Sequence, residues 1–128
     1  AEAAVREKAG NPQQAITMNG QAVFKFAARA MADAVTCVLE NAGLSLDDIA
    51  CIVPHQANER IVKFAAKKLE CDMDKFHLCI AHAGNTSAAS VPLALADAYA
   101  AGRIKRGDKV VLVGFGGGFT SGALVYEA

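Results

Sequence analysis

The chain of 128 residues has the length of one ordinary domain and is long enough to bury a core of its own. Thirteen lysines and arginines balance thirteen aspartates and glutamates, so the net charge is zero and no overall field favours nucleic acid or an anionic membrane. The apolar fraction of 53% exceeds the roughly 45 to 50% of soluble domains, which indicates buried interface. No apolar stretch reaches the about 20 residues of a transmembrane helix.

The N-terminal segment, residues 1–17, is polar and contains neither a hydrophobic stretch nor a cleavage pattern of a secretion signal. Because the chain starts on Ala1, we interpret it as a trimmed chain or fragment, with residues 1–17 as an N-terminal remnant or linker and 18–128 as one domain. The cysteines have no C-x-x-C spacing and lie in or beside apolar segments, which predicts reduced, buried thiols and a cytoplasmic protein. These cysteines are Cys37, Cys51, Cys71 and Cys79.

The first predicted element is an amphipathic helix, because apolar residues recur at steps of three and four from Phe24 to Ala42. Gly43 follows in the position where glycine usually ends a helix. Ser45 and Asp48 then have the spacing of a capping box, which predicts one short helical turn.

The continuous apolar run at 49–53, ended by Pro54, predicts a strand covered on both faces. A helix is expected over 57–70, with a basic outer face and a buried apolar face. The residues predicted to be exposed are Arg60, Lys63 and Lys67, and those predicted to be buried are Ile61, Phe64, Ala65 and Leu69.

The rest of the chain predicts three further strands and one helix. A strand is expected over 75–81, with His77 facing solvent and His82 in the following loop. Residues 87–102 predict a helix of small residues that lies between two sheets, since small side chains allow close approach on several sides. Strands are expected over 108–116 and 121–128, joined by a turn at 116–118.

The fold class that follows is α/β, in the order α-β-α-β-α-β-β. Two strand-helix-strand crossovers predict a mixed, mostly parallel sheet packed with helices, and the last pair of strands adds an antiparallel neighbour. The excess of apolar residues and the helix of small residues together indicate half of a larger layered unit.

Unusual residues follow three of the predicted strands, where ligand sites form in open α/β sheets. His55 follows the first strand, Asn85 follows the second, and Gly116 to Gly118 follow the third. Together they would offer an imidazole, a carboxamide and backbone N–H groups to one pocket, a set that suits a developing oxyanion. None of these groups is a nucleophile. The arrangement therefore needs one from outside the segment, and a cysteine is best suited to acyl transfer from thioesters.

Each of these residues also has an ordinary structural interpretation. His55 fits a satisfied loop residue, Asn85 fits a turn or a helix N-cap, and the glycines fit a tight turn. The coincidence of three strand ends favours the functional interpretation.

Three stretches together resemble a known family: "VFKFAARAM", "VPHQANERIV" and "GNTSAASVPLALADAYAAGRIKRGDKVVLVGFGGGFTSGAL". From about Met18 to the end, the sequence is similar to the C-terminal half of β-ketoacyl-acyl-carrier-protein synthase III, a thiolase-fold condensing enzyme. The order and spacing of "PHQAN", "GNTSAAS" and "GFGGG" make the resemblance specific.

The resemblance implies an acyltransferase that starts fatty acid synthesis. In the family a Cys takes an acyl group from coenzyme A, malonyl carrier protein loses carbon dioxide, and its enolate attacks. By resemblance His55 and Asn85 are the catalytic residues that hold the malonyl thioester carbonyl, and the Gly117 amide belongs to the oxyanion hole. Gly20 and Asn58 would contribute to the channel for coenzyme A. The family's nucleophilic Cys lies in the N-terminal half, so this chain is expected to be inactive alone.

The resemblance also implies partners. We expect the N-terminal half of the same enzyme, an acyl carrier protein contacted by Lys25 and Arg60, and a homodimer of the full enzyme, with no metal ion and no cofactor beyond the substrates acyl-CoA and malonyl carrier protein. Two alternatives remain open, a condensing enzyme of a polyketide or other specialised pathway, and a non-catalytic assembly module of the same fold.

Overall fold

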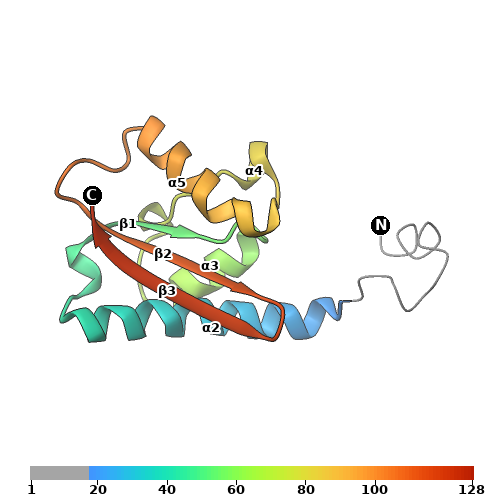
Figure 1. Ribbon diagram of the computed structural model, residues 1–128. Helices are drawn as coiled ribbons and strands as arrows, with labels where there is room; N and C mark the ends of the chain where they lie inside the picture. The colour runs from blue at the N-terminus through green and yellow to red at the C-terminus, as the bar shows by residue number, and fades with distance from the viewer. Residues whose placement is uncertain (1–17) are drawn as a thin grey trace.

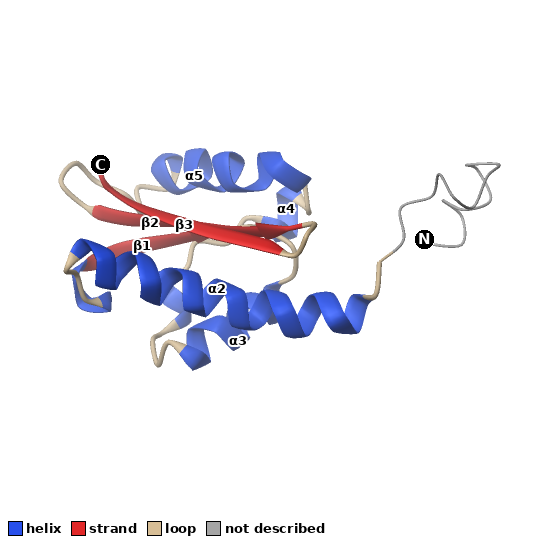
Figure 2. Cartoon of the chain, turned by 60° about the horizontal axis from the view of Figure 1, so that its bottom comes forward, coloured by secondary structure: helices blue, strands red, loops and turns tan. Residues whose placement is uncertain are grey.

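The computed structural model describes residues 18–128, and the interpretation of residues 1–17 as a remnant or linker lies outside the described residues. Figure 2 shows the sheet with α5 on one face and α2 and α3 on the other. The helices are α2 (Gly20–Ala42), α3 (Glu59–Lys68), α4 (Ile80–Ala83) and α5 (Ser90–Ala100), and the strands are β1 (Ile49–Pro54), β2 (Lys109–Gly116) and β3 (Thr120–Glu127) (Figure 1).

The sheet has three strands in the order β1-β2-β3, with β1 and β2 parallel and β2 and β3 antiparallel. The parallel pair runs from Ile49 beside Lys109 to Pro54 beside Val113. Its two carboxyl ends therefore lie at the same edge of the sheet. The antiparallel pair ends with Gly116 beside Thr120, so the loop that joins β2 to β3 also lies at that edge.

The strand predicted over 75–81 is wrong in extent, because only Phe76 forms a parallel bridge with Ile52 on the free side of β1. The His77 N–H still donates to the Ile52 carbonyl at 2.9 Å, but the chain then turns into α4. The Gln56 side chain accounts for this early departure. Its amide donates to the His77 carbonyl at 3.2 Å and its carbonyl accepts from the Cys79 N–H at 3.1 Å, in place of further backbone pairs.

Two apolar cores lie on opposite faces of the sheet. The larger joins Val111 and Val113 of β2 to the inner faces of α2 and α3, with Met31 completely buried. The smaller joins the other face to Ala94 and Ala98 of α5. β1 contributes Ile52 to the larger core and Cys51 and Val53 to the smaller, so both of its faces are covered, as predicted for the apolar run at 49–53.

The predicted ends of the first helix and the turn after it are confirmed. Gly43 has a φ of 65°, and its N–H donates to the Glu40 carbonyl at the end of α2. Ser45 and Asp48 form the expected capping box, in which the carboxylate accepts from the Ser45 N–H at 2.8 Å. This arrangement fixes the direction in which the chain enters β1.

The burial of α3 differs from the prediction at one aromatic residue. Phe64 is 49% exposed, whereas Val62 and Ala66 are buried together with Ile61 and Ala65. Small residues allow α3 to approach α2 closely, and the larger Phe64 ring is left at the side of the contact, where it lines a groove beside α2. Leu69 is half-buried.

Four cysteine or histidine residues also differ from the prediction. Cys37 is exposed on α2, because it lies outside the apolar stripe of that helix, and Cys71 is half-buried; Cys51 and Cys79 are buried as expected. His77 is buried and not solvent-facing, since its Nε2 lies 2.7 Å from the Asp97 carboxylate on α5. His82 belongs to α4 and its side chain is exposed.

The helix of small residues packs against one sheet within residues 18–128. Its outer side leaves Leu93 46% exposed and Tyr99 44% exposed. The expectation of a second covering sheet stays a prediction. Within residues 18–128, no helix has the length and apolar character needed to cross a membrane.

Candidate active site

Three chain segments bring the predicted site residues to one edge of the sheet. His55 follows β1, Gly117 follows β2, and the segment that runs parallel to β1 leads through α4 to Asn85. Their side chains and backbone line one hollow of about 650 Å³. The hollow is lined by all five of the residues predicted for catalysis, the oxyanion hole and coenzyme A binding, which are Gly20, His55, Asn58, Asn85 and Gly117.

Contacts of the backbone and of the ring fix the position of His55. Its backbone N–H donates to the Val113 carbonyl at 2.8 Å, which keeps the residue at the end of β1. The Nδ1 atom is hydrogen-bonded to the Ser90 hydroxyl, and the ring meets the Phe115 ring edge-on with 5.1 Å between centroids. Burial lowers the pKa of His55, because desolvation disfavours the imidazolium form. The ring is therefore suited to act as a neutral hydrogen-bond donor.

The orientation of the Asn85 carboxamide follows from its own turn. Its Oδ1 accepts from the Ser87 N–H at 3.2 Å, so the side chain forms a local turn and does not cap a helix. Gly84 before it has a φ of 72°, a conformation that suits glycine. With the oxygen engaged by the backbone, the amide NH₂ group remains to donate to a ligand in the hollow.

The glycine loop offers a backbone donor to the same hollow. The Gly117 carbonyl accepts from the Thr120 hydroxyl at 3.0 Å, and its N–H has no hydrogen-bond partner among residues 18–128. The next residue, Gly118, has a φ of 141°, and a Cβ added there would lie 2.8 Å from Thr120 Cγ2 and 3.0 Å from Thr120 N. The turn therefore requires glycine at position 118.

The two residues predicted to contact coenzyme A begin helices beside the hollow. Asn58 caps α3, since its Oδ1 accepts from the Arg60 N–H at 2.9 Å. Gly20 is the first residue of α2, and a Cβ added there would meet nothing within 4 Å. Both residues are exposed, so a ligand can reach them.

Sequence reasoning missed three residues that build the site. Gln56 and Ser90 are each only 1% exposed. The Gln56 side chain makes hydrogen bonds to His77 and Cys79 in the segment that leads to Asn85, and the Ser90 hydroxyl makes hydrogen bonds to His55 and to the Gln56 N–H. Phe115 supplies the ring beside His55. A usable signal for Gln56 was its position directly after the strand, where a polar residue that enters the core must be satisfied. No comparable signal marks Ser90, whose partners lie 34 and 35 positions away.

No cysteine lines the hollow within the described part of the chain. Burial raises the pKa of the Cys51 and Cys79 thiols, which disfavours the reactive thiolate. Residues 18–128 also contain no group of three or more histidines, cysteines and acidic residues that could hold a metal ion. Within residues 18–128, the hollow thus supplies hydrogen-bond donors and no cysteine nucleophile.

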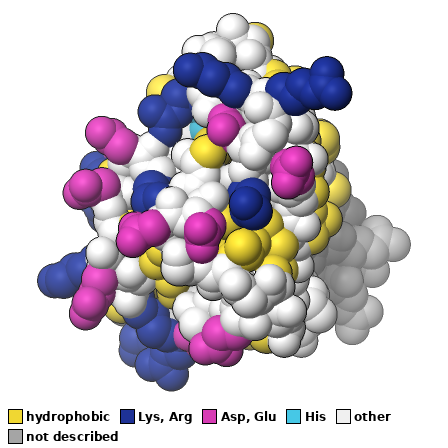
Figure 3. Space-filling view, turned by 90° about the vertical axis from the view of Figure 1, so that its left-hand side faces the viewer, with side chains coloured by type: hydrophobic (Ala, Val, Ile, Leu, Met, Phe, Trp, Pro, Cys, Tyr) yellow, Lys and Arg dark blue, Asp and Glu magenta, His cyan; other side chains and the backbone are white. Residues whose placement is uncertain are grey.

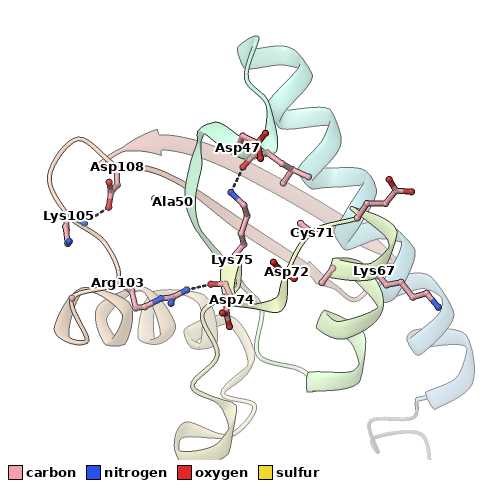
Figure 4. A pocket seen from close by; sticks show the side chains of 14 residues that line it. Asp47, Ala50, Lys67, Cys71, Asp72, Asp74, Lys75, Arg103, Lys105 and Asp108 are labelled. Atoms are coloured by element: carbon pink, nitrogen blue, oxygen red, sulfur yellow. Dashed lines mark hydrogen bonds between the residues drawn. The ribbon is translucent and has the colours of Figure 1, made fainter.

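A larger hollow, of about 980 Å³, lies at the opposite ends of the strands. Figure 3 shows acidic and basic side chains interspersed on that face, and Figure 4 shows the side chains that line the hollow. The Lys75 ammonium donates to the carbonyls of Leu46 and Ile49, and the Arg103 guanidinium donates to the Asp74 carbonyl. These charges stabilise the loops around them and present no single sign to a ligand.

The basic residues near the site lie on two helices, α2 and α3. Lys25 and Arg29 line a groove of about 490 Å³ between α2 and α3, and Phe24 lines both this groove and the candidate active site. Arg60 is exposed in the first turn of α3. Lys63 pairs with Glu59 on the same helix at 2.7 Å. Lys67 is exposed as predicted and lines the larger hollow at the opposite ends of the strands.

Comparison with known families identifies the chain. Residues 39–128 match the family model described as 3-oxoacyl-[acyl-carrier-protein (ACP)] synthase III C terminal. The chain belongs to this family. The match includes β1, α3, α5, β2 and β3, and with them His55, Asn85 and Gly117.

Curated relatives give the same assignment. The chain is 50% identical over 121 residues to beta-ketoacyl-[acyl-carrier-protein] synthase III of Clostridium acetobutylicum. This match covers 94% of this chain and 37% of the relative. It is 56% identical over 112 residues to the enzyme of the same name from Clostridioides difficile, and this match covers 88% of this chain and 34% of the relative. The chain therefore spans about a third of the length of these relatives.

Solved structures confirm the predicted thiolase-like α/β fold. The synthase III of Thermus thermophilus superimposes with a TM-score of 0.86 at 46% identity over 89% of this chain and 36% of that one. The 3-oxoacyl-(acyl carrier protein) synthase III of Pseudomonas aeruginosa superimposes with a TM-score of 0.86 at 38% identity, and the match covers 95% of this chain and 38% of that one. The priming beta-ketosynthase of the R1128 polyketide pathway superimposes with a TM-score of 0.80 at 32% identity, and the match covers 94% of this chain and 38% of that one.

Proposed function

We propose that this chain is the C-terminal part of a condensing enzyme that joins an acyl-CoA primer to malonyl-acyl-carrier protein and so starts fatty acid synthesis. The observation that carries the proposal is that His55 after β1, Asn85 after α4 and Gly117 after β2 line one hollow. Relatives at 50% and 56% identity are named as synthases of this kind. The chain covers about a third of their length, so the remaining part of the site comes from an upstream half.

The chemistry follows from the donors in the hollow. When malonyl thioester loses carbon dioxide, the electron pair of the broken C–C bond moves toward the thioester oxygen and forms an enolate. N–H groups of His55 and Asn85 hold that oxygen without transferring a proton to it, which stabilises the charge by about 3 to 4 kcal/mol for each well-placed donor. The enolate carbon then attacks the acyl group bound to the nucleophile.

The second oxyanion forms on the acyl group under attack. The Gly117 N–H is a free donor in the same hollow, and it would bind this oxygen together with the amide of the nucleophilic residue from the upstream half. The attack of the enolate carbon forms the new C–C bond and the tetrahedral intermediate. Its collapse re-forms the carbonyl, breaks the C–S bond and expels the cysteine thiolate. The residues of this chain bind, orient and stabilise charge throughout, and the reaction needs no metal ion or cofactor beyond its thioester substrates.

The solved structures bear on which pathway the enzyme serves. The polyketide priming ketosynthase is 32% identical, against 46% for the Thermus thermophilus synthase III. The closer similarity to the second favours fatty acid synthesis. The exposed outer face of α5 fits an enzyme in which the upstream half and a second copy complete a homodimer.

The decisive experiment measures carbon dioxide release from malonyl carrier protein by a protein that contains this chain together with the upstream half. We expect Asn85→Ala to lower the rate by about a hundredfold or more, since it removes one oxyanion donor. Asn41→Ala is the matched control, because Asn41 is exposed on α2 and does not line the hollow. Equal rates of release by wild type and Asn85→Ala would refute the role of Asn85, and the absence of release by the wild-type protein would refute the proposal and favour an assembly module.

A further inference from the structure

Ser90 links the first turn of α5 to the connection between β1 and α3. The residue is only 1% exposed, and its hydroxyl oxygen has two neighbours from that connection. One is His55 Nδ1, and the other is the Gln56 N–H, whose nitrogen lies 3.2 Å away. A single hydroxyl group thus contacts both the imidazole and the backbone of the next residue.

The positions of the protons follow from counting donors and acceptors. A serine hydroxyl has one proton to donate, and its oxygen can accept two hydrogen bonds. A buried O–H group needs an acceptor. The Gln56 N–H is a donor, so His55 Nδ1 is the one acceptor that the Ser90 proton has among residues 18–128. The Ser90 proton therefore lies toward Nδ1, and the proton of the neutral imidazole lies on Nε2.

We propose that Ser90 is a positioning residue that fixes His55 in the tautomer with its proton on Nε2. This inference rests on the proposed function, because the tautomer matters where the imidazole has to donate to a thioester oxygen. The other tautomer would turn a lone pair toward a developing negative charge, so it would remove a donor and add repulsion. Ser90 does not line the hollow, so its effect on a ligand there is exerted through His55, which does.

The ionised form of His55 is opposed by the same contact. An imidazolium carries protons on both ring nitrogens, so its Nδ1–H would face the Ser90 proton unless the hydroxyl rotated away from its acceptor. Rotation would leave a buried O–H group without a partner among the described residues, which is unfavourable. The hydroxyl thus selects a neutral imidazole as well as one tautomer.

The first test is the imidazole ¹⁵N spectrum of the wild-type protein, with this chain and the upstream half present. The His55 signals are assigned by their loss in His55→Gln. We expect a protonated Nε2 and an unprotonated Nδ1 that accepts a hydrogen bond, and a protonated Nδ1 would overturn the proposal. The spectrum requires no turnover. A failure of this inference is therefore distinguishable from a failure of the proposed function, which is measured by carbon dioxide release.

The second test is Ser90→Ala. We expect both tautomers in the His55 spectrum and a fall of about tenfold in kcat for malonyl decarboxylation, which corresponds to about 1.4 kcal/mol, with KM little changed. Ser45→Ala is the control, because it removes a capping hydroxyl before β1, away from the hollow. It should lower stability and leave the His55 spectrum and kcat unchanged. A folded Ser90→Ala protein with the wild-type spectrum would contradict the proposal, and if this variant does not fold, the wild-type spectrum decides alone.

Discussion

At the scale of single residues, the site is built from neutral donors whose other polar atom is already engaged. His55 uses Nδ1 to contact Ser90, and Asn85 uses Oδ1 to accept from the Ser87 N–H. The donor of each group is thereby aimed before a ligand arrives. Donors fixed in this way can stabilise a developing anion at little reorganisation cost, which is the physical basis of the catalytic role proposed for them.

The lowered pKa of His55 predicts an activity that persists in mild acid. Burial moves the folded-state pKa below the usual value of about 6.5, so the neutral imidazole persists below that pH. We expect the acid limb of malonyl decarboxylation to lie below about pH 6.5. In the same window the unfolded chain binds more protons at this residue than the folded chain does. His55 therefore lowers the free energy of unfolding progressively as the pH falls below about 6.5.

The measurement that checks this prediction is the pH-rate profile, together with an NMR titration of His55. His82→Asn serves as the control, because His82 has an exposed side chain that does not line the hollow. This variant should keep the wild-type profile. An acid limb at or above pH 6.5 that follows the titration of His55 would contradict the assignment.

That the candidate catalytic residues lie together could be predicted from sequence, but the residues that hold them could not. His55 and Gly117 follow the parallel strands β1 and β2, and Asn85 follows the segment that bridges to β1 at Phe76, so the common edge of the sheet places them together. Gln56 and Ser90 act through side-chain hydrogen bonds to partners more than twenty positions away. Such contacts depend on how α5 and the segment before α4 pack, which local patterns do not specify.

At the scale of elements, the turn between β2 and β3 determines where the Gly117 N–H lies. β2 and β3 remain paired up to Gly116 and Thr120, so the turn has little freedom at either end. The Thr120 hydroxyl also donates to the Gly117 carbonyl. The orientation of this one peptide therefore depends on the conformation of Gly118.

We predict that Gly118→Ala disrupts this turn. The φ of 141° disfavours any side chain, and the new Cβ would meet Thr120 at 2.8 Å and 3.0 Å, the second contact being with its backbone nitrogen. The condensation rate should fall at least about tenfold, and the free energy of unfolding should fall by about 1 to 3 kcal/mol. Enzyme assays and denaturant unfolding measure these effects.

Gly122→Ala is the matched control for the turn. Gly122 lies in β3, and a Cβ there would meet nothing within 4 Å. It should keep both rate and stability close to wild type. Wild-type condensation by Gly118→Ala would show that the turn adapts and that the Gly117 amide has no fixed role.

The differences between predicted and observed elements have one physical cause, which is tertiary packing. The segment 75–81 has the composition of a strand, but the Gln56 side chain takes the hydrogen bonds that would continue its pairing with β1. Phe64 fits the helical period, yet small residues form the contact between α3 and α2 and leave its ring outside. Periodicity predicts which residues share a face, whereas the size of the neighbours decides which part of the face is buried.

At the scale of the whole molecule, the two sides of the sheet differ in how completely they are covered. α2 and α3 together cover one face, whereas α5 alone covers the other and leaves Leu93 and Tyr99 exposed (Figure 2). Since the chain spans about a third of its relatives' length, the outer side of α5 is where we expect the upstream half to pack. The candidate active site would then be closed by residues from both halves.

The rim of that site carries the charges that would meet an acidic carrier protein. Arg60 is exposed next to Asn58, which lines the hollow, and Lys25 lines the adjoining groove. We predict that Arg60→Glu raises KM for malonyl carrier protein about fivefold and leaves kcat nearly unchanged, because a rim charge contributes to association more than to chemistry. A small malonyl thioester that lacks the protein should show little change. Steady-state kinetics with the two substrates provide the comparison.

Lys105→Glu separates a local effect from a change in net charge. It makes the same change of two units, but Lys105 lines the larger hollow at the opposite ends of the strands. If the carrier protein docks beside α3, only Arg60→Glu should raise KM, and the increase should shrink as salt screens the rim charges. Equal increases for both variants would mean that net charge alone attracts the carrier protein. An equal increase for the small thioester would place Arg60 in the binding of the thioester itself.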